Sequence, residues 1–407
     1  RLYVEQRKEM GFPFIKQQET GRSAVPAPSG GAPSGQPSTF LLEIGTEELA
    51  VADLTLALEQ LQALVPELLA ANRLSCESVR VVGTPRRQAA LVYGLSPRQP
   101  DRTVEVQGPP AKVAFDAEGN LTRAGQGFAQ KQGVAVEALR VVTEGDKSYV
   151  VATRTEPGRP AGELLAEEMP KLLARLRFPK TMRWNLANIT FPRPLRWLVA
   201  LLGDQVVPFA YAGVSSGRTT RGLRPLGSPD IELADAAGYL AAMAEHQIVV
   251  DVAERRQQIG AQAEALAASA GGRILADPDL MDEVTNMVER PTAVLGSFEP
   301  EYLDLPHEVL TTAMKKHQRY FPVIDAAGSD LLPHFVAVRN GDDQSLSIVR
   351  QGYEDVLRAR FADARFFYGQ DTARPLDSFL PRLDTLTFQE KLGSMLDKSK
   401  RLEELAP

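Results

Sequence analysis

The stretch that decides the fold covers residues 39–72 and reads TFLLEIGTEELAVADLTLALEQLQALVPELLAAN. Its first six residues have the apolar composition of a strand. The residues that follow change to helical spacing, because apolar positions recur every three to four residues. These positions are Leu54, Leu58, Leu61, Val65, Leu68 and Leu69. We therefore expect a strand followed by an amphipathic helix, which Pro66 kinks or divides.

The rest of the chain alternates between these two patterns. Strand candidates such as SVRVVG, QAALVYGL and SYVVATRT follow, with helix candidates among them. The pattern predicts an α+β, multidomain chain. We expect a mixed α/β block over 39–225, a mainly helical block over 226–290, and a smaller α/β block over 291–407 that ends in helices.

Residues 17–38 have the composition of a flexible linker, since 12 of these 22 residues are Gly, Pro or Ser. Such a segment buries too little apolar surface to offset the entropy lost on ordering. The preceding segment, 1–16, is therefore expected to be tethered to the rest, and it reads as a helix end closed by Gly11. The last residues have a helical pattern without a capping residue. We expect the sequence to be part of a longer protein.

The composition is that of an ordinary globular protein, with 43% apolar and 24% charged residues among 407. A single cysteine, Cys76, rules out a disulfide framework and a cysteine-based zinc site within the sequence, which suits a reducing compartment. The four histidines lack the spacing of a helical zinc site. No apolar run reaches the ~18 residues of a membrane-spanning helix. We expect a cytoplasmic protein with no membrane partner and no metal site.

Positive charge is concentrated in one part of an acidic sequence. The net charge is −6, yet residues 171–225 contain ten cations and a single acid, Asp204, so this segment carries +9 and the remainder −15. The cations are Lys171, Arg175, Arg177, Lys180, Arg183, Arg193, Arg196, Arg218, Arg221 and Arg224. A region of one sign attracts polyanions, which predicts a local nucleic-acid surface.

This segment contains one phrase twice, FPKTMRW from Phe178 and FPRPLRW from Phe191. In a helical conformation the two cations of each copy share one face. The tryptophan of each copy then stacks on an unpaired base or holds a cation by cation–π attraction. The alternative is that the aromatic residues fill a core. The RNA contacts predicted in the two copies are Lys180, Arg183, Trp184, Arg193, Arg196 and Trp197.

Three further basic segments have a similar character. GVSSGRTTRGLRP carries arginines at three-residue spacing, with glycines that allow close backbone approach to phosphates. GTPRRQA and MKKHQRYFPV are smaller candidates. The RNA contacts predicted in the three segments are Arg218, Arg221, Arg224, Arg86, Arg87, Lys315, Lys316 and Arg319.

The sequence contains no complete active site that we recognise. Glu47 and Glu48 are adjacent carboxylates, but neighbouring helical positions diverge by ~100°. Thr46 as a helix N-cap, with acids in the first turn, explains them. A phosphate-binding loop, a dinucleotide-binding glycine motif and a nucleophile elbow are all absent from the sequence. We predict no catalytic residue and no metal ligand.

Several motifs together resemble a known family. They are FLLEIGTEEL, GTPRR, FPKTMRW, RPLRWLVALLGDQVVPF, GVSSGRTTRG, ERPTAVLGSFEPEYLDLPHEVLTTAMKKHQRYFPV and FQEKLGSM. In this order, from about Phe40 onward, they resemble the β subunit of bacterial glycyl-tRNA synthetase. The segment 1–16, with YVEQR and MGFPFIK, is similar to the C-terminal tail of that enzyme's α subunit. The resemblance therefore implies a fused α–β arrangement joined by residues 17–38.

The resemblance also implies a function. The family's enzyme joins glycine to tRNA(Gly) with ATP and releases AMP and diphosphate. Its class II core, which takes ATP and Mg²⁺, belongs to the α-type portion, so no cofactor is expected in this chain. The β-type region is expected to bind and orient tRNA(Gly) and to support the α-type portion or its dimer. The alternative is a non-catalytic scaffold or RNA-binding module that mainly mediates α–β assembly.

Overall fold

A computed structural model describes most of the chain. The described residues are 5–6, 35–116, 119–145 and 147–406. The predicted tail over 1–16 lies outside them except for 5–6, and so does most of the predicted linker.

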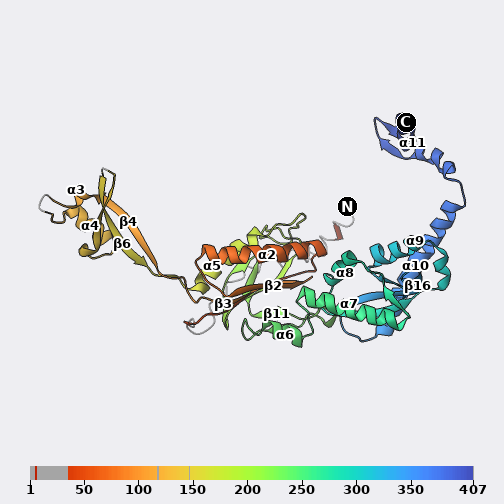
Figure 1. The fold of residues 1–407 in the computed structure, drawn as a ribbon, viewed down its shortest axis with the longest axis horizontal. Helices are drawn as coiled ribbons and strands as arrows, with labels where there is room; N and C mark the ends of the chain where they lie inside the picture. The colour runs from red at the N-terminus through yellow and green to blue at the C-terminus, as the bar shows by residue number, and fades with distance from the viewer. Residues whose placement is uncertain (1–4, 7–34, 117–118, 146, 407) are drawn as a thin grey trace. The chain divides into compact units, whose positions relative to one another are not determined.

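The chain divides into two compact units, unit 1 (Arg1–Asp251) and unit 2 (Val252–Pro407) (Figure 1). Both units combine sheets with helices, which confirms the predicted α+β class. The division falls inside the segment predicted to be a helical block, 226–290. The part of this block before Val252 belongs to unit 1, and the later helices of the block, α7 (Val252–Ser269) and α8 (Pro278–Thr285), belong to unit 2.

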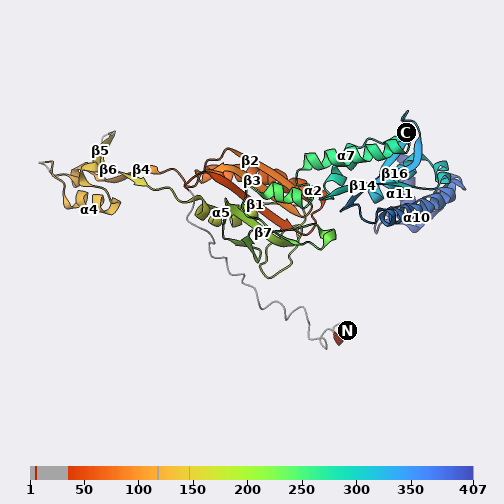
Figure 2. The same cartoon turned by 90° about the horizontal axis from the view of Figure 1, so that it is seen from below.

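A seven-stranded sheet forms the centre of unit 1, in the order β2-β3-β1-β7-β10-β9, with β8 paired to β7. The predicted first strand is β1, which is antiparallel to β3 on one side and to β7 on the other (Figure 2). The strands of this sheet are β1 (Ser38–Thr46), β2 (Ser78–Thr84), β3 (Arg87–Leu95), β7 (Leu195–Leu202), β8 (Gln205–Val206), β9 (Ala210–Tyr211) and β10 (Val214–Gly217).

The two faces of this sheet are covered by different elements. Because successive strand residues point to opposite faces, Phe40, Leu42 and Ile44 enter one core and Leu41 the other. Helices α2 and α5 pack on the first core, and β11, β12 and α6 close the second. These elements are α2 (Val51–Ala71), α5 (Ala161–Arg175), β11 (Thr219–Arg221), η3 (Arg224–Leu226), β12 (Asp230–Glu232) and α6 (Tyr239–Glu245).

Helix α2 is the amphipathic helix expected from residues 39–72. It is a single helix with Pro66 inside it, so the proline does not divide it. Among the described residues, α2 alone is long and apolar enough to cross a membrane by length and composition. Leu54, Leu61 and Leu69 on its apolar face are buried in the first core of unit 1, so α2 is a core helix.

A small module of unit 1 has its own three-stranded sheet, in the order β4-β6-β5. Its helix α4 begins at the N-cap Thr122, whose hydroxyl accepts a bond from the Gly125 amide, and it ends at Gly133 with φ of 68°. Glycine is favoured there because this left-handed conformation strains other residues. The elements of the module are β4 (Arg102–Pro110), α3 (Ala111–Ala114), α4 (Arg123–Gln132), η2 (Val136–Ala138), β5 (Leu139–Glu144) and β6 (Lys147–Glu156).

Unit 2 is built on a four-stranded sheet in the order β13-β15-β16-β14. Ile259 and Ala263 of α7 pack in one core, whereas Leu357 and Phe361 of α10 pack in another. The elements around the sheet are α7 (Val252–Ser269), β13 (Gly272–Ile274), α8 (Pro278–Thr285), β14 (Pro291–Ser297), η4 (Pro300–Asp304), α9 (His307–Thr312), the π-helix η5 (Ala313–Gln318), β15 (Phe321–Asp325), β16 (Leu331–Asn340) and α10 (Leu346–Thr372). The elements after α10 are η6 (Leu376–Thr385), β17 (Thr387–Gln389), β18 (Gly393–Ser394) and α11 (Met395–Leu405).

Candidate nucleic-acid interface

Trp197 is a core residue of unit 1. It lies in β7 directly opposite Gly45 of β1 and is only 6% exposed. A Cβ atom at position 45 would lie 1.9 Å from the indole, so only glycine leaves room for the ring. The indole Nε1–H donates to Glu43 Oε1 at 2.7 Å, and the Thr220 hydroxyl donates to the same oxygen at 2.6 Å. Trp197 therefore does not stack on a base in this structure.

Two predicted RNA contacts, Arg86 and Arg87, belong to the same buried arrangement. Their guanidinium carbons lie 5.5 and 5.7 Å from the centroid of the Trp197 ring. Arg86 Nη1 donates to the carbonyl of Gly222 at 3.1 Å, and Arg87 Nη2 donates to that of Arg221 at 2.7 Å. Since both side chains are buried, their position does not agree with a phosphate contact. They fasten the β11 region to the sheet.

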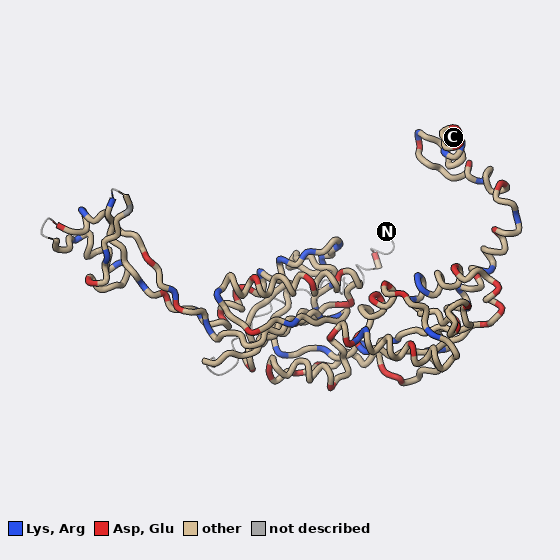
Figure 3. The backbone as a smooth tube through the Cα atoms, viewed as in Figure 1, with Lys and Arg blue, Asp and Glu red and all other residues tan. Residues whose placement is uncertain are grey.

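The cationic segment is not a one-sign surface in the folded chain. Five of its ten cations pair with carboxylates, mostly from elsewhere in the sequence, and Figure 3 shows acidic and basic residues interspersed along the backbone of unit 1. The pairs are Lys171–Glu168, Arg175–Glu67, Arg196–Glu47, Arg221–Asp230 and Arg224 with both Glu47 and Glu48. The predicted RNA contacts Arg196, Arg221 and Arg224 are thus exposed but partly neutralised, since an ion pair weakens the attraction of each for a phosphate.

The carboxylates of the GTEEL turn are partners of arginines rather than helix caps. Glu47 Oε1 accepts a bond from Arg196 Nε at 2.6 Å, and Arg224 lies 3.3 Å from a Glu48 oxygen. Helix α2 begins later, after Ala50, and has no side-chain cap. The predicted N-cap Thr46 lies at the end of β1 instead. Its place in the strand results from the pairing of β1 with β3 and β7, which extends through the whole IGT sequence.

One part of the cationic segment keeps its charge. We call residues 176–194, between α5 and β7, the basic loop; it contains four cations and no acid. No carboxylate pairs with these cations among the described residues: two of them bond only to backbone carbonyls, and the other two make no bond that the structure records. All four are exposed. They are Arg177, Lys180, Arg183 and Arg193.

Aromatic residues of the basic loop pack against one another and against the core of unit 1, and they hold the loop in place. The Phe178 and Phe191 rings pack edge to face, with centroids 4.9 Å apart. The backbone of Met182 exchanges two hydrogen bonds with that of Phe191, at 2.9 and 3.3 Å. Trp184 is half-buried against the first core. The first copy of the phrase is therefore irregular chain, and the second leads into strand β7, so neither is helical. Their aromatic residues pack beneath the cations instead of sharing a face with them.

The remaining predicted contacts are more constrained. Arg218 donates to three backbone carbonyls, those of Asp204, Leu233 and Ala234, and so ties the segment after β12 to the turn between β7 and β8. Among the predicted residues of unit 2, Lys315 and Arg319 form ion pairs with carboxylates of the α8 region, whereas Lys316 is exposed and forms none in the described part of the chain.

The ion pair between Lys315 and Asp277 also stabilises a helix. Burial opposes ionisation of Asp277, but hydrogen bonds from Lys315 and from the Leu280 amide outweigh it, and the pKa of Asp277 is lowered. The Leu280 amide donates to the carboxylate at 3.0 Å, so Asp277 is the N-cap of α8. Lys315 is therefore committed to the fold rather than free for RNA.

Sequence reasoning missed the residues that organise this region, Glu43 and Gly45. A glutamate within the apolar run FLLEIG was a usable signal, because a buried carboxylate needs hydrogen-bond donors. The described residues contain no group of three His, Cys, Asp or Glu side chains placed to hold a metal ion. The arrangement as a whole is a folded platform that presents cations, with no assembled catalytic group that we identify.

Proteins similar in sequence to this chain are named as glycine–tRNA ligases. The family model described as glycyl-tRNA synthetase beta subunit matches residues 40–407, and the chain belongs to this family. The glycine–tRNA ligase beta subunit of Desulfitobacterium hafniense (strain DSM 10664 / DCB-2) is 46% identical over 367 residues, which cover 90% of this chain and 53% of that protein. The chloroplastic/mitochondrial glycine–tRNA ligase 2 of Arabidopsis thaliana is 45% identical over 372 residues, 91% of this chain and 35% of that protein. The chain thus spans about half the length of the bacterial relative and about a third of the plant protein.

Proposed function

We propose that this chain is the β-type region of a glycine–tRNA ligase, which joins glycine to tRNA(Gly) with ATP and releases AMP and diphosphate. Its membership of the glycyl-tRNA synthetase beta subunit family over residues 40–407 carries this proposal. In this scheme an α-type portion binds ATP with Mg²⁺ and glycine, and the β-type region binds and orients the tRNA. A cytoplasmic location fits an enzyme of protein synthesis.

The basic loop is the part of this region best suited to hold the tRNA backbone. No carboxylate of the described residues pairs with its four exposed cations, and its aromatic residues pack beneath them. Lysine and arginine contacts to phosphates supply affinity and position with little sequence preference. Arg193 and the neighbouring Arg196 extend the same surface toward the GTEEL turn.

We also propose that an α-type portion is fused ahead of residue 17. The segment 1–16 resembles the end of an α subunit. The Arabidopsis relative is named as a ligase without a subunit designation, and the chain covers a smaller share of it than of the bacterial β subunit. Both observations fit a longer single polypeptide.

An assembly scaffold is the second candidate, and one observation favours it. Half of the cations in the 171–225 segment are paired, which weakens their attraction for RNA. On this view the exposed charges of the GTEEL turn meet the α-type portion, and a pull-down with an isolated α subunit would detect it.

The salt dependence of tRNA binding tests the proposal. The double variant Lys180→Gln/Arg183→Gln should weaken binding of tRNA(Gly) and reduce the slope of log K against log salt by about 1.4 to 1.8, the value for two lost phosphate contacts at ~0.7–0.9 each. The matched control is Lys171→Gln/Arg175→Gln, which removes two exposed cations that are already paired. An unchanged slope in a folded Lys180/Arg183 variant would exclude the basic loop as the phosphate contact.

A further inference from the structure

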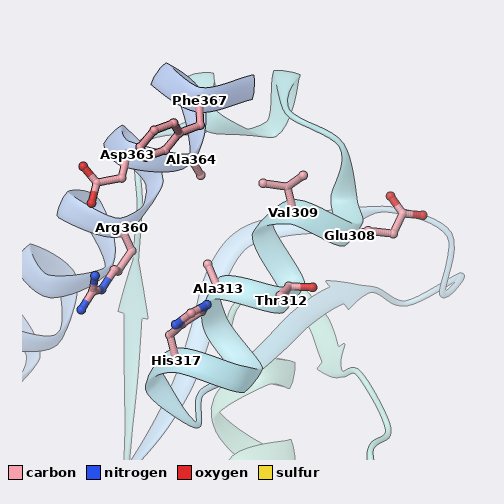
Figure 4. A pocket seen from close by; sticks show the side chains of 9 residues that line it. All are labelled: Glu308, Val309, Thr312, Ala313, His317, Arg360, Asp363, Ala364 and Phe367. Atoms are coloured by element: carbon pink, nitrogen blue, oxygen red, sulfur yellow. The ribbon is translucent and has the colours of Figure 1, made fainter. Parts of the chain in front are cut away.

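A hollow of about 610 Å³ lies in unit 2 between the α9–η5 helix and α10 (Figure 4). Its floor is apolar: Val309 and Ala313 on one helix face Ala364 and Phe367 on the other (Figure 4). The volume falls within the range of ~300–1,000 Å³ that small-ligand sites occupy, and such sites are mostly apolar with a few polar groups.

The rim of the hollow carries charged and polar side chains that have no partner in the fold. Neither an ion pair nor a hydrogen bond is made by these side chains within the described part of the chain. Two can donate to an anion and two are carboxylates. They are His317, Arg360, Glu308 and Asp363. Figure 4 shows Arg360 and Asp363 on α10 and His317 and Glu308 on the opposite helix, with the Glu308 carboxylate directed away from α10.

The lack of a partner sets Arg360 apart from its neighbours. The other three arginines of α10 pair with carboxylates: Arg350 with Glu354, Arg358 with Glu299 and Asp355, and Arg365 with Glu301. On the opposite helix, Lys315 is paired, whereas His317 on the rim is not. Arg360 and His317 are thus two unpaired donors at the hollow, whereas Lys316, which is also unpaired in the described part of the chain, does not line it.

Phe367 gives the hollow an aromatic surface in contact with solvent, because the side chain is 63% exposed. The helix opposite contains a π-helical turn, Ala313–Gln318, that ends at Arg319 with φ of 57°. Single π-helical turns are rare and are often found at functional sites. This turn carries His317 to the rim of the hollow.

We propose that this hollow binds one unpaired nucleotide of an RNA strand. The base stacks on Phe367 over the apolar floor, as bases stack on aromatic side chains in single-strand binding sites. Arg360 and His317 donate hydrogen bonds to its phosphate. Asp363 accepts a hydrogen bond from a base amino group or from a ribose hydroxyl, and the negative charges of Asp363 and Glu308 disfavour the dense phosphate array of a duplex. The inference rests on the proposed role in RNA binding, although its residues are separate from the basic loop.

Titration of the whole chain with a fluorescently labelled short single-stranded RNA tests the inference. Phe367→Ala and Arg360→Gln should each weaken binding about tenfold, the effect of losing one stacked base or one charged contact. Matched controls are Tyr368→Ala, an aromatic side chain of α10 that is 40% exposed and does not line the hollow, and Arg350→Gln on the same helix. Both controls should bind as the unchanged chain does.

Three outcomes separate this inference from the proposed function. In the first outcome the chain binds tRNA(Gly) through the basic loop, but it does not bind single-stranded RNA, or Phe367→Ala and Arg360→Gln have no effect on that binding. This result overturns the nucleotide site and leaves the proposed function standing. Phe367-dependent binding of single-stranded RNA without binding of tRNA(Gly) supports the site and counts against the proposed function. If Phe367→Ala changes the sedimentation of the chain but not its RNA affinity, the hollow is a contact between copies and the inference is wrong.

Discussion

A methyl group added at Gly45 would enter the indole ring of Trp197. The Cβ atom of an alanine would lie 1.9, 2.0 and 2.5 Å from three ring atoms, whereas carbon atoms in contact stay ~3.5–4.0 Å apart. The ring would have to move by roughly 1.5 Å. It is held by the hydrogen bond to Glu43 and by the guanidinium groups of Arg86 and Arg87.

The expected cost follows from these contacts. Overpacking a core costs ~1–3 kcal/mol, and displacing the indole weakens a buried hydrogen bond to a carboxylate, which adds ~1–3 kcal/mol. We expect Gly45→Ala to lower the free energy of unfolding of unit 1 by about 2 to 6 kcal/mol. In a Trp197→Leu background the same change should cost less than about 1 kcal/mol, because the clash is gone.

Tryptophan fluorescence during urea unfolding measures this energy selectively. Both tryptophans of the chain, Trp184 and Trp197, lie in unit 1, so the signal reports that unit. The control is Gly162→Ala in α5, where the nearest atom is 3.9 Å away and alanine should stabilise the helix by ~0.5–1 kcal/mol. If Gly45→Ala unfolds within about 0.5 kcal/mol of the unchanged chain, the packing argument for Trp197 is wrong.

Two further predictions concern ion pairs. Asp277→Asn keeps the helix cap but loses the pair with Lys315, so calorimetry at neutral pH should show a loss of about 1 to 2 kcal/mol. The pKa of Asp277 is lowered in the folded chain, so the stability that its ionised carboxylate contributes is fully present above the unfolded pKa of ~3.9. This stability disappears as the pH falls through the folded pKa. A difference in stability between the Asn variant and the unchanged chain that persists at lower pH would contradict this assignment. Glu47→Gln releases Arg196 and Arg224 from a carboxylate, so the affinity for tRNA(Gly) at low salt should rise by up to about fivefold. An unchanged affinity with the fold intact would mean that neither arginine faces the RNA.

The secondary structure was largely predictable because local pattern determines it. The change from a strand pattern to helical spacing within residues 39–72 predicted β1 and α2. The prediction failed where a motif was too short to show its period. The shared face expected for the cations of FPRPLRW depended on a helical conformation, but in β7 the strand period of two puts Arg196 outside and Trp197 inside.

The sequence by itself determined the α+β class and the family, since both depend on the order and spacing of residues along the chain. It also determined that residues 171–225 carry excess positive charge. Only the tertiary structure decided which of these cations remain available. Arg175 forms an ion pair with Glu67, 108 positions away, and Arg196 with Glu47, 149 positions away, so each is partly neutralised. Charges interact through distance in space, so composition along the sequence does not define the electrostatic surface of the folded protein.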